Sequence, residues 1–186
     1  MQHLTPRLRL REFHPSDWEA VLCYQSDPRY LRYYDWTSRT EAEVRAFVDR
    51  FIRDQAESPR LRFQFAITLR TPAPDSDTLI GNCGIRKASE EATEGDIGYE
   101  LAPWFWGHGY ATEAARAVVA FGFDTLTLHR IWAECVAENT ASVHVLEKLG
   151  MQQEGHLREN RWMKGRWWDT LVYGILDREW RDKENP

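Results

Sequence analysis

A glycine-containing segment at residues 103–113 carries the most distinctive chemistry of this sequence. It reads Pro-Trp-Phe-Trp-Gly-His-Gly-Tyr-Ala-Thr-Glu and lies between a predicted strand and a predicted helix. Gly107 and Gly109 let the main chain approach a ligand closely and turn its amides outward. The N-terminus of the following helix adds free N–H groups and a positive dipole end. The segment is therefore suited to hold a phosphate group.

Neither of the two commonest phosphate-binding loops fits this segment. No Gly-Lys-Ser/Thr follows the glycines, which excludes a Walker loop, and the third glycine of a dinucleotide-binding fingerprint is absent. A tight strand-to-helix turn that binds nothing is the alternative interpretation.

A second candidate lies at residues 136–142, which read Val-Ala-Glu-Asn-Thr-Ala-Ser, again where a predicted strand leads into a predicted helix. Asn139 is a natural helix N-cap, and Ser142 follows three residues later. Capping alone explains both residues. The functional alternative is that Asn139 and Ser142 face the same ligand as the glycine segment.

Glu100 is the candidate general base. Side chains alternate along a strand, so Glu94, Asp96, Gly98 and Glu100 share one face of the predicted strand 94–101. Glu100 ends that strand beside the glycine segment, where a carboxylate could accept a proton from a bound molecule. An exposed polar residue without a role is the alternative.

Composition excludes several classes of protein. The chain has 186 residues, 42% of them apolar and 28% charged, which predicts one globular domain. The net charge is −5 and there is no basic tract, so we expect no nucleic acid as the main ligand. No apolar stretch is long enough for a membrane helix, and no signal sequence is evident. Three widely spaced cysteines give neither a disulfide framework nor a zinc pattern, and we expect buried thiols, no metal and a cytoplasmic location.

The period of the apolar residues alternates between that of strands and that of helices. The order mixes antiparallel neighbours with one crossover, which predicts an α/β or α+β fold with a mixed sheet. We expect strands at 7–13, 63–69, 78–87, 94–101, 129–136, 152–163 and 166–177. We expect a helix opened by residues 15–17 and ending at about 26, helices at 38–56 and 139–149, and a glycine-containing turn followed by a helix within 107–123. A ring-rich loop is expected at 28–40 and a turn at 71–78.

Five segments in order resemble the GNAT superfamily of acyl-coenzyme A-dependent N-acyltransferases. The similarity is greatest to its Rim-type branch, the ribosomal-protein N-terminal acetyltransferases and their small-molecule relatives. The segments are the opening Leu-Thr-Pro-Arg-Leu-Arg-Leu-Arg at 4–11, the glycine loop, Ala-Glu-Asn-Thr-Ala-Ser-Val at 137–143, Glu-Lys-Leu-Gly-Met at 147–151 and the closing hairpin.

The resemblance implies one GNAT-like domain over residues 5–180, followed by a tail at 181–186. Its fold would be a mixed, mostly antiparallel seven-stranded sheet flanked by about four helices. The sheet would splay between its fourth and fifth strands, which here are 94–101 and 129–136.

The resemblance also implies acetyl-CoA as co-substrate, held through main-chain amides of the glycine loop. Trp106 stands where the family has Gln or Arg, and His108 where Lys or Arg is frequent. The residues expected to bind the cofactor are Leu101, Trp106, Gly107, His108, Gly109, Tyr110, Ala111, Thr112, Asn139 and Ser142.

Direct transfer to a primary amine is the implied reaction. An α-amine costs only about 1 kcal/mol to deprotonate at pH 7, whereas a lysine costs about 4.6 kcal/mol, so a modest base such as Glu100 suffices. Many relatives place a proton-donating Tyr seven residues after the Asn, but here that residue is Leu146. Ser142 resembles the substitute donor of the Rim-type branch.

The acceptor, a protein N-terminus or a small-molecule amine, would meet the segment between the first two helices and the closing hairpin. The candidates are Tyr30, Tyr33, Tyr34, Trp36, Arg161, Trp162, Trp167 and Trp168, although rings at this density also suit a core. Surface aromatics make a homodimer an expectation. A non-catalytic acyl-CoA-binding or sensor module, or a plain nucleotide-binding protein, are the alternative functions.

Overall fold

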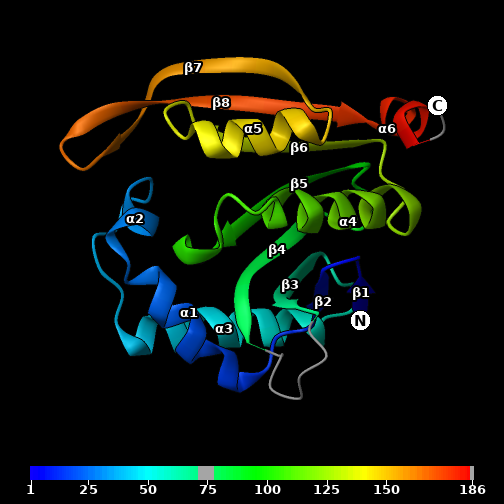
Figure 1. The fold of residues 1–186 in the computed structure, drawn as a ribbon. Helices are drawn as coiled ribbons and strands as arrows, with labels where there is room; N and C mark the ends of the chain where they lie inside the picture. Colours follow the sequence, from blue (N-terminus) through cyan, green and yellow to red (C-terminus); the bar gives the residue numbers. More distant parts are fainter. Residues whose placement is uncertain (71–77, 185–186) are drawn as a thin grey trace.

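Eight strands form one mixed sheet in the order β1-β2-β3-β4-β5-β6-β8-β7 (Figure 1). The computed structural model describes residues 1–70 and 78–184. Every neighbouring pair is antiparallel except β5 and β6, which are parallel. The strands are β1 Gln2–Leu4, β2 Leu8–Arg11, β3 Arg62–Leu69, β4 Leu79–Lys87, β5 Glu94–Leu101, β6 Arg130–Val136, β7 Gln152–Met163 and β8 Arg166–Leu176.

Short capping signals set where the helices begin. Thr40 and Glu43 form a capping box at the start of α3, and the side chain of Asn139 accepts the N–H of Ser142 at the start of α5. Two turns of 3-10 helix precede α1 and α4. The helices are α1 Trp18–Gln25, α2 Pro28–Leu31, α3 Glu41–Gln55, α4 Tyr110–Asp124, α5 Thr140–Lys148 and α6 Asp177–Glu184.

The two faces of the sheet pack against different helices. On one face, Phe65, Ile85 and Ile97 join the buried residues of α4 in the larger core. On the other face, Ala66 packs with Val48 of α3 and with the buried side of α1. The alternation of apolar side chains along β3 thus places a helical layer on each side (Figure 1).

The sheet opens between β5 and β6. Pairing covers only the first three residues of β5, Glu94 to Asp96, although β5 continues to Leu101 and β6 to Val136. The C-terminal halves of these two strands are therefore free of each other, which confirms the predicted splay. α4 connects the two strands and lies over the sheet beside the opening (Figure 1).

The structure adds elements that the sequence did not predict. β1 makes eight strands rather than seven, because three residues are too short to show a period. α2 lies within the predicted loop 28–40, capped by Asp27, and α6 continues into the predicted tail to residue 184. The predicted turn at 71–78 falls outside the described residues except for residue 78. Cys23 is exposed rather than buried, whereas Cys83 and Cys135 are buried as expected.

None of the helices in the described part of the chain has both the length and the apolar character needed to cross a lipid bilayer.

Candidate active site at the splay of the sheet

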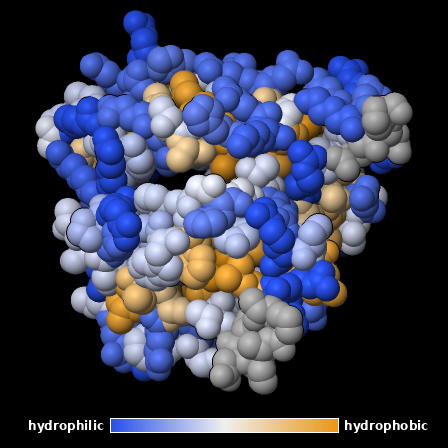
Figure 2. All heavy atoms as spheres, viewed as in Figure 1, coloured by the Kyte–Doolittle hydropathy of each residue, from blue (hydrophilic) through white to orange (hydrophobic). Residues whose placement is uncertain are grey.

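A cavity of about 700 Å³ opens between the loop before α4, the start of α5 and α2. Figure 2 shows it as a slot between the part of the molecule that carries α5 and the part that carries the start of α4, with mostly hydrophilic residues at its rim. Nine of the ten predicted cofactor-binding residues line it; only His108 does not. The glycine loop and the segment with Asn139 and Ser142, which are separate in the sequence, therefore line one cavity.

The glycine loop has the backbone that its residues predicted. Gly107 and Gly109 have φ angles of +80° and +78°, a region that side-chain-bearing residues rarely adopt. Gly109 is the N-cap residue of α4, so the first N–H groups of the helix, from Tyr110 onward, lack acceptors within the helix. These groups make this end of the cavity suited to an anion.

Trp106 joins the glycine loop to the preceding strand. Its indole N–H donates to the carbonyl oxygen of Leu101 at 2.8 Å, which ties the loop to the end of β5. His108 turns away from the cavity: its ring stacks on Tyr110, with centroids 5.5 Å apart, and its Nδ1 lies 2.8 Å from the Trp106 carbonyl oxygen. The imidazole is thus not part of the cavity wall.

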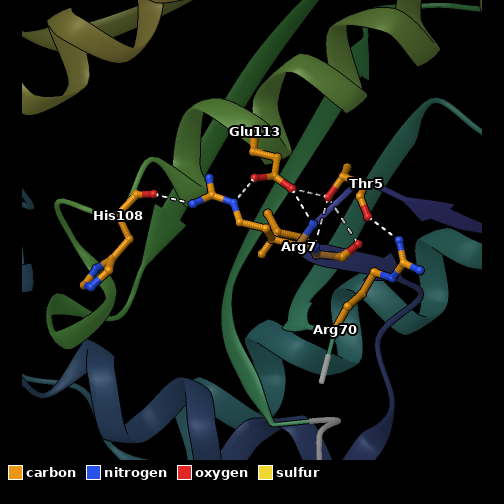
Figure 3. Close-up of polar contacts among 6 residues, drawn as sticks. Thr5, Arg7, Arg70, His108 and Glu113 are labelled. Atoms are coloured by element: carbon orange, nitrogen blue, oxygen red, sulfur yellow. Dashed lines mark hydrogen bonds and ion pairs between the residues drawn. The ribbon is translucent and has the colours of Figure 1, made fainter. Parts of the chain in front are cut away.

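Arg7 links the glycine loop to α4 (Figure 3). Its Nη1 donates to the main-chain carbonyl of His108 at 2.9 Å, and its Nε donates to Glu113 of α4 at 2.6 Å. The guanidinium also lies 4.7 Å from the centre of the Tyr110 ring. One side chain, from the residue before β2, therefore contacts both the glycine loop and the first turn of α4.

Glu113 receives three donors at this junction. Besides Arg7 Nε, the main-chain N–H of Arg7 donates at 2.9 Å and the Thr5 hydroxyl at 2.6 Å. Burial acts to raise the pKa of Glu113, but the bonds from Thr5 and Arg7 outweigh it and lower that pKa. We refer to Thr5, Arg7 and Glu113 as the clasp.

At the deep end of the cavity, Ser142 and Tyr99 form a hydroxyl pair. Their side-chain oxygens are 2.9 Å apart, and the Tyr99 hydroxyl also lies 3.1 Å from the Ser142 carbonyl oxygen. Burial raises the pKa of Tyr99, so its phenol stays protonated. Burial likewise raises the pKa of the neighbouring Cys135 thiol to about 11. Leu146, where the resemblance led us to look for a Tyr, is 1% exposed and belongs to the core.

A second cavity of about 540 Å³ lies on the opposite face of the sheet, under α3. Asp96, Gly98 and Glu100 of β5 line it, while Ile97, Tyr99 and Leu101 pack in or against the larger core, as the alternation of the strand predicts. Tyr34, Tyr99, Glu100, Glu134 and Ser142 line both cavities. The two cavities therefore meet where β5 and β6 separate.

Glu100 sits inside a cage of neutral donors. Tyr24 donates to its carboxylate at 2.6 Å, Gln25 at 3.1 Å and Tyr34 at 3.4 Å, and Tyr30 and Asn82 donate as well. Burial, and then the charge of Glu100, raise the pKa values of the tyrosines, which therefore remain donors. The carboxylate oxygens are thus largely occupied.

Glu134 is the carboxylate that the sequence analysis missed. It lies on β6, is exposed, and lines both cavities. Its main chain pairs with β8, but its side chain makes no hydrogen bond or ion pair with any residue of the ranges 1–70 and 78–184. A signal existed, since Glu134 is the one charged residue in the run 131–136, which is otherwise apolar.

Comparison with known proteins decides the family. The model described as "Acetyltransferase (GNAT) domain" matches residues 7–152. The uncharacterized N-acetyltransferase YnaD of Bacillus subtilis is 38% identical over 97% of this chain and 99% of its own. The chain belongs to the GNAT acetyltransferase family. As a GNAT enzyme it is an acyl-CoA-dependent N-acetyltransferase.

Solved GNAT structures share its fold. A GNAT-family acetyltransferase from Bacillus anthracis is 33% identical, covers 96% of this chain and 99% of its own, and superposes with a TM-score of 0.81. A spermidine N-acetyltransferase from Vibrio cholerae, in complex with CoA and spermine, has a TM-score of 0.79 at 22% identity, with coverages of 95% and 99%. At that identity the second likeness concerns the fold alone.

The aromatic candidates of this GNAT domain separate into three groups. Tyr30, Tyr33 and Tyr34 line the first cavity, as does Arg161. Trp36 lines neither cavity and packs on Tyr34, and Trp168 is 6% exposed and packs on Tyr33. Trp162 and Trp167 line neither cavity; they are 61% and 51% exposed and contact each other edge-on.

No group of three or more His, Cys, Asp or Glu side chains in the described ranges is arranged to hold a metal ion.

Proposed function

We propose that this GNAT enzyme binds acetyl-CoA in the first cavity and a primary amine in the second, and transfers the acetyl group directly between them. The observation that carries this proposal is the junction of the two cavities at Tyr99, Glu100, Glu134 and Ser142. Two molecules that enter from opposite faces of the sheet can meet there without an acyl-enzyme intermediate. Most of the acceleration then comes from holding them together, which is worth up to ~7–11 kcal/mol.

The first cavity suits the cofactor because its anion-binding end continues into a more apolar inner part. The main-chain amides around Gly109 hold the diphosphate, and Asn139 and Ser142 line the path of the pantetheine arm. The CoA complex of the spermidine N-acetyltransferase, a protein of the same fold, supports this choice of cavity occupant.

The proton of the amine goes to a carboxylate at the junction. Glu134 is free of partners within the described chain, whereas Glu100, the base predicted from the sequence, is already occupied by donors. We therefore assign proton acceptance to Glu134, directly or through a water, and assign to Glu100 the placement of its tyrosine cage. Attack by the neutral amine on the thioester expels the CoA thiolate.

The thiolate takes its proton from the hydroxyl pair. Ser142 lines both cavities and its oxygen is 2.9 Å from the Tyr99 hydroxyl, so Ser142 can donate to the sulfur while Tyr99 donates to Ser142. This replaces the absent phenol at Leu146. Whether the acceptor is a protein N-terminal α-amine, as the Rim-type resemblance implies, or a small molecule, the same two steps apply.

Initial-rate kinetics test the proposal. With both substrates varied, direct transfer gives intersecting double-reciprocal plots, and no acetylated protein accumulates when acetyl-CoA is mixed with enzyme alone. Parallel plots with an acetyl-enzyme detected by mass spectrometry contradict direct transfer. Binding of acetyl-CoA by calorimetry without CoA release for any amine of a broad panel supports the non-catalytic sensor instead.

A homodimer and a cytoplasmic location complete the proposal. The exposed pair Trp162 and Trp167 on the closing hairpin supports self-association, since paired indoles on a surface are typical of interfaces. The three free cysteines suit a reducing compartment. Sedimentation of the Trp162→Ser variant against the parent chain tests the dimer.

A further inference from the structure

We propose that the acceptor carries, besides its primary amine, an anionic group held by Arg50 and Arg62 at the outer end of the second cavity. The acceptor class is thus a small anionic amine, an amino-carboxylate or an amino-phosphate. This inference rests on the proposed function and specifies the substrate of that same site. Its evidence is the order in which charged side chains follow one another along the floor of the cavity.

The floor consists of three rows across the sheet. Strand pairing aligns Arg62, Arg86 and Asp96 in the outer row, and Ala66, Asn82 and Glu100 in the inner row. Between them lies a row formed by Gln64, Gly84 and Gly98, two of which have no side chain of their own. Asp96 of the outer row and Glu100 are four positions apart on β5, a span of roughly 13 Å.

Cations outnumber carboxylates away from Glu100 and Glu134: Arg50, Arg62 and Arg86 line the cavity there, with Asp54 and Asp96. Arg62 of β3 and Arg50 of α3 are exposed, line the cavity and make no ion pair with any residue of the described ranges. Arg50 is held by stacking near the Phe47 and Phe51 rings, 5.5 and 5.4 Å from their centres. A guanidinium with free donors is the side chain best suited to bind carboxylate or phosphate in a fork.

Arg86 extends the positive end toward the middle of the floor. A Cβ atom placed on Gly98 would lie 3.3 Å from its Nη2, so the guanidinium passes over that glycine. Its charge is matched by an ion pair with Asp96. Arg86 therefore shapes the floor, and the charge available to a ligand comes from Arg50 and Arg62.

The inner end carries the opposite charge. Glu100 and Glu134 line the cavity there, and no cationic side chain of the described chain donates to either. An ammonium group is attracted to this end before it loses its proton, while an anionic group is attracted to the outer end. The cavity thus orients a molecule that has both groups, with its amine toward the first cavity.

A diamine or polyamine does not fit this order of charges. Its second ammonium group would lie beside Arg50 and Arg62, where like charges repel. A neutral alkylamine avoids the repulsion but leaves both guanidinium groups without a partner. The side chains therefore favour the anionic amine over both alternatives.

A panel of matched amines tests the inference on the full-length enzyme with acetyl-CoA. Aminobutyrate, aminohexanoate and aminooctanoate, with amine and carboxylate at opposite ends, are compared with the alkylamine and the alkane diamine of equal carbon number. Aminoethyl phosphate is compared with ethanolamine, which separates a phosphate from a carboxylate preference. At low ionic strength we expect kcat/KM for the anionic amine to exceed that for its neutral match about tenfold, with the diamine lowest.

Variants show where the preference originates. Arg62→Gln and Arg50→Gln each lower the ratio of anionic to neutral kcat/KM severalfold, and Arg62→Glu moves the preference toward the diamine. Arg53→Gln is the matched control, because Arg53 is exposed one turn from Arg50 on the same helix and lines neither cavity. It leaves the ratio as in the parent.

Equal kcat/KM for anionic and neutral amines, or a loss in Arg62→Gln and Arg50→Gln that is the same for every amine, overturns the inference while direct transfer stands. Preference for the diamine in the parent enzyme overturns it too. Absence of transfer to any amine, with acetyl-CoA bound, overturns the proposed function and this inference with it.

Discussion

The two cavities of this GNAT enzyme meet where β5 and β6 separate, but main-chain groups define one of them and side chains define the other. The first owes its anion-binding end to main-chain amides near Gly107 and Gly109 and to the first turns of α4 and α5. The second is lined by charged side chains from α3 and four strands, among them Arg50, Arg62 and Glu134. One site is therefore defined by backbone shape and the other by side-chain identity.

In the proposed function, this difference separates cofactor binding from acceptor choice. A backbone site depends little on which side chains surround it, and the Trp106 side chain bonds the main chain at the end of β5. A side-chain site changes its ligand with each substitution, so acceptor choice can diverge while cofactor binding stays. Variants in the two cavities should accordingly alter different kinetic constants.

The largest effect is expected at the junction itself. Glu134→Gln keeps the shape of the site but removes the proton acceptor, so kcat should fall about a hundredfold or more and its dependence on pH should flatten. Binding of acetyl-CoA, measured by calorimetry, should stay within about twofold of the parent. The measurement is steady-state kinetics from pH 6 to 9.

Glu100→Gln is the matched comparison for that variant. Its amide oxygen can still accept from Tyr24, and its amide N–H can donate to the hydroxyl oxygen of Tyr30, so we expect a smaller loss with the pH profile preserved. The opposite outcome, a flattened pH profile of kcat in Glu100→Gln and an unchanged one in Glu134→Gln, would show that Glu100 is the general base.

A smaller effect is expected at the hydroxyl pair. Ser142→Ala removes the group nearest the leaving thiolate and should lower kcat about tenfold, because water can replace it in part. Tyr99→Phe keeps the ring packing and should lower kcat only severalfold. The rates are also measured with an acetyl thioester whose thiol is a poor leaving group. If kcat of both variants then equals that of the parent, the thiolate takes its proton from solvent.

The sequence predicts those features of the site that depend on neighbouring residues along the chain. The turn at Gly107 and Gly109 and the shared face of Asp96 and Glu100 follow from residue type and from the period of a strand, and the structure confirms both. The fold class and the splay followed from a resemblance over nearly the whole chain.

The parts that the sequence did not reveal depend on contacts between distant segments. The donors Tyr24 and Gln25 are 76 and 75 residues from Glu100, and no local pattern records that they converge on it. Glu134 faces both cavities only because β5 and β6 separate beside it. Trp162 and Trp167 resemble binding residues in composition, yet they extend to solvent away from both cavities.

The smallest effect is expected from the clasp, which acts on the backbone cavity through its positioning residue Arg7. Arg7→Gln loses the ion pair with Glu113 and the bond to the His108 carbonyl (Figure 3). Because the side chain of Arg7 is half exposed, the cost is on the order of 1 kcal/mol, which corresponds to about fivefold in KM for acetyl-CoA. KM for the amine and kcat should change less than twofold, and Arg7→Lys should restore part of the loss. Arg45→Gln breaks an exposed ion pair far from the loop and serves as control.

The dependence of CoA affinity on acidic pH tests whether the clasp supports the cofactor loop. Because the pKa of Glu113 lies below its ordinary value in the folded protein, the clasp is complete above about pH 4.3 and is lost as the pH falls through the lowered value. Affinity for CoA should therefore drop at low pH in the parent and drop less in Arg7→Gln, where the clasp is already broken. Parallel acid curves for the two proteins, measured by calorimetry, would show that Arg7 and Glu113 hold no part of the cofactor loop in place.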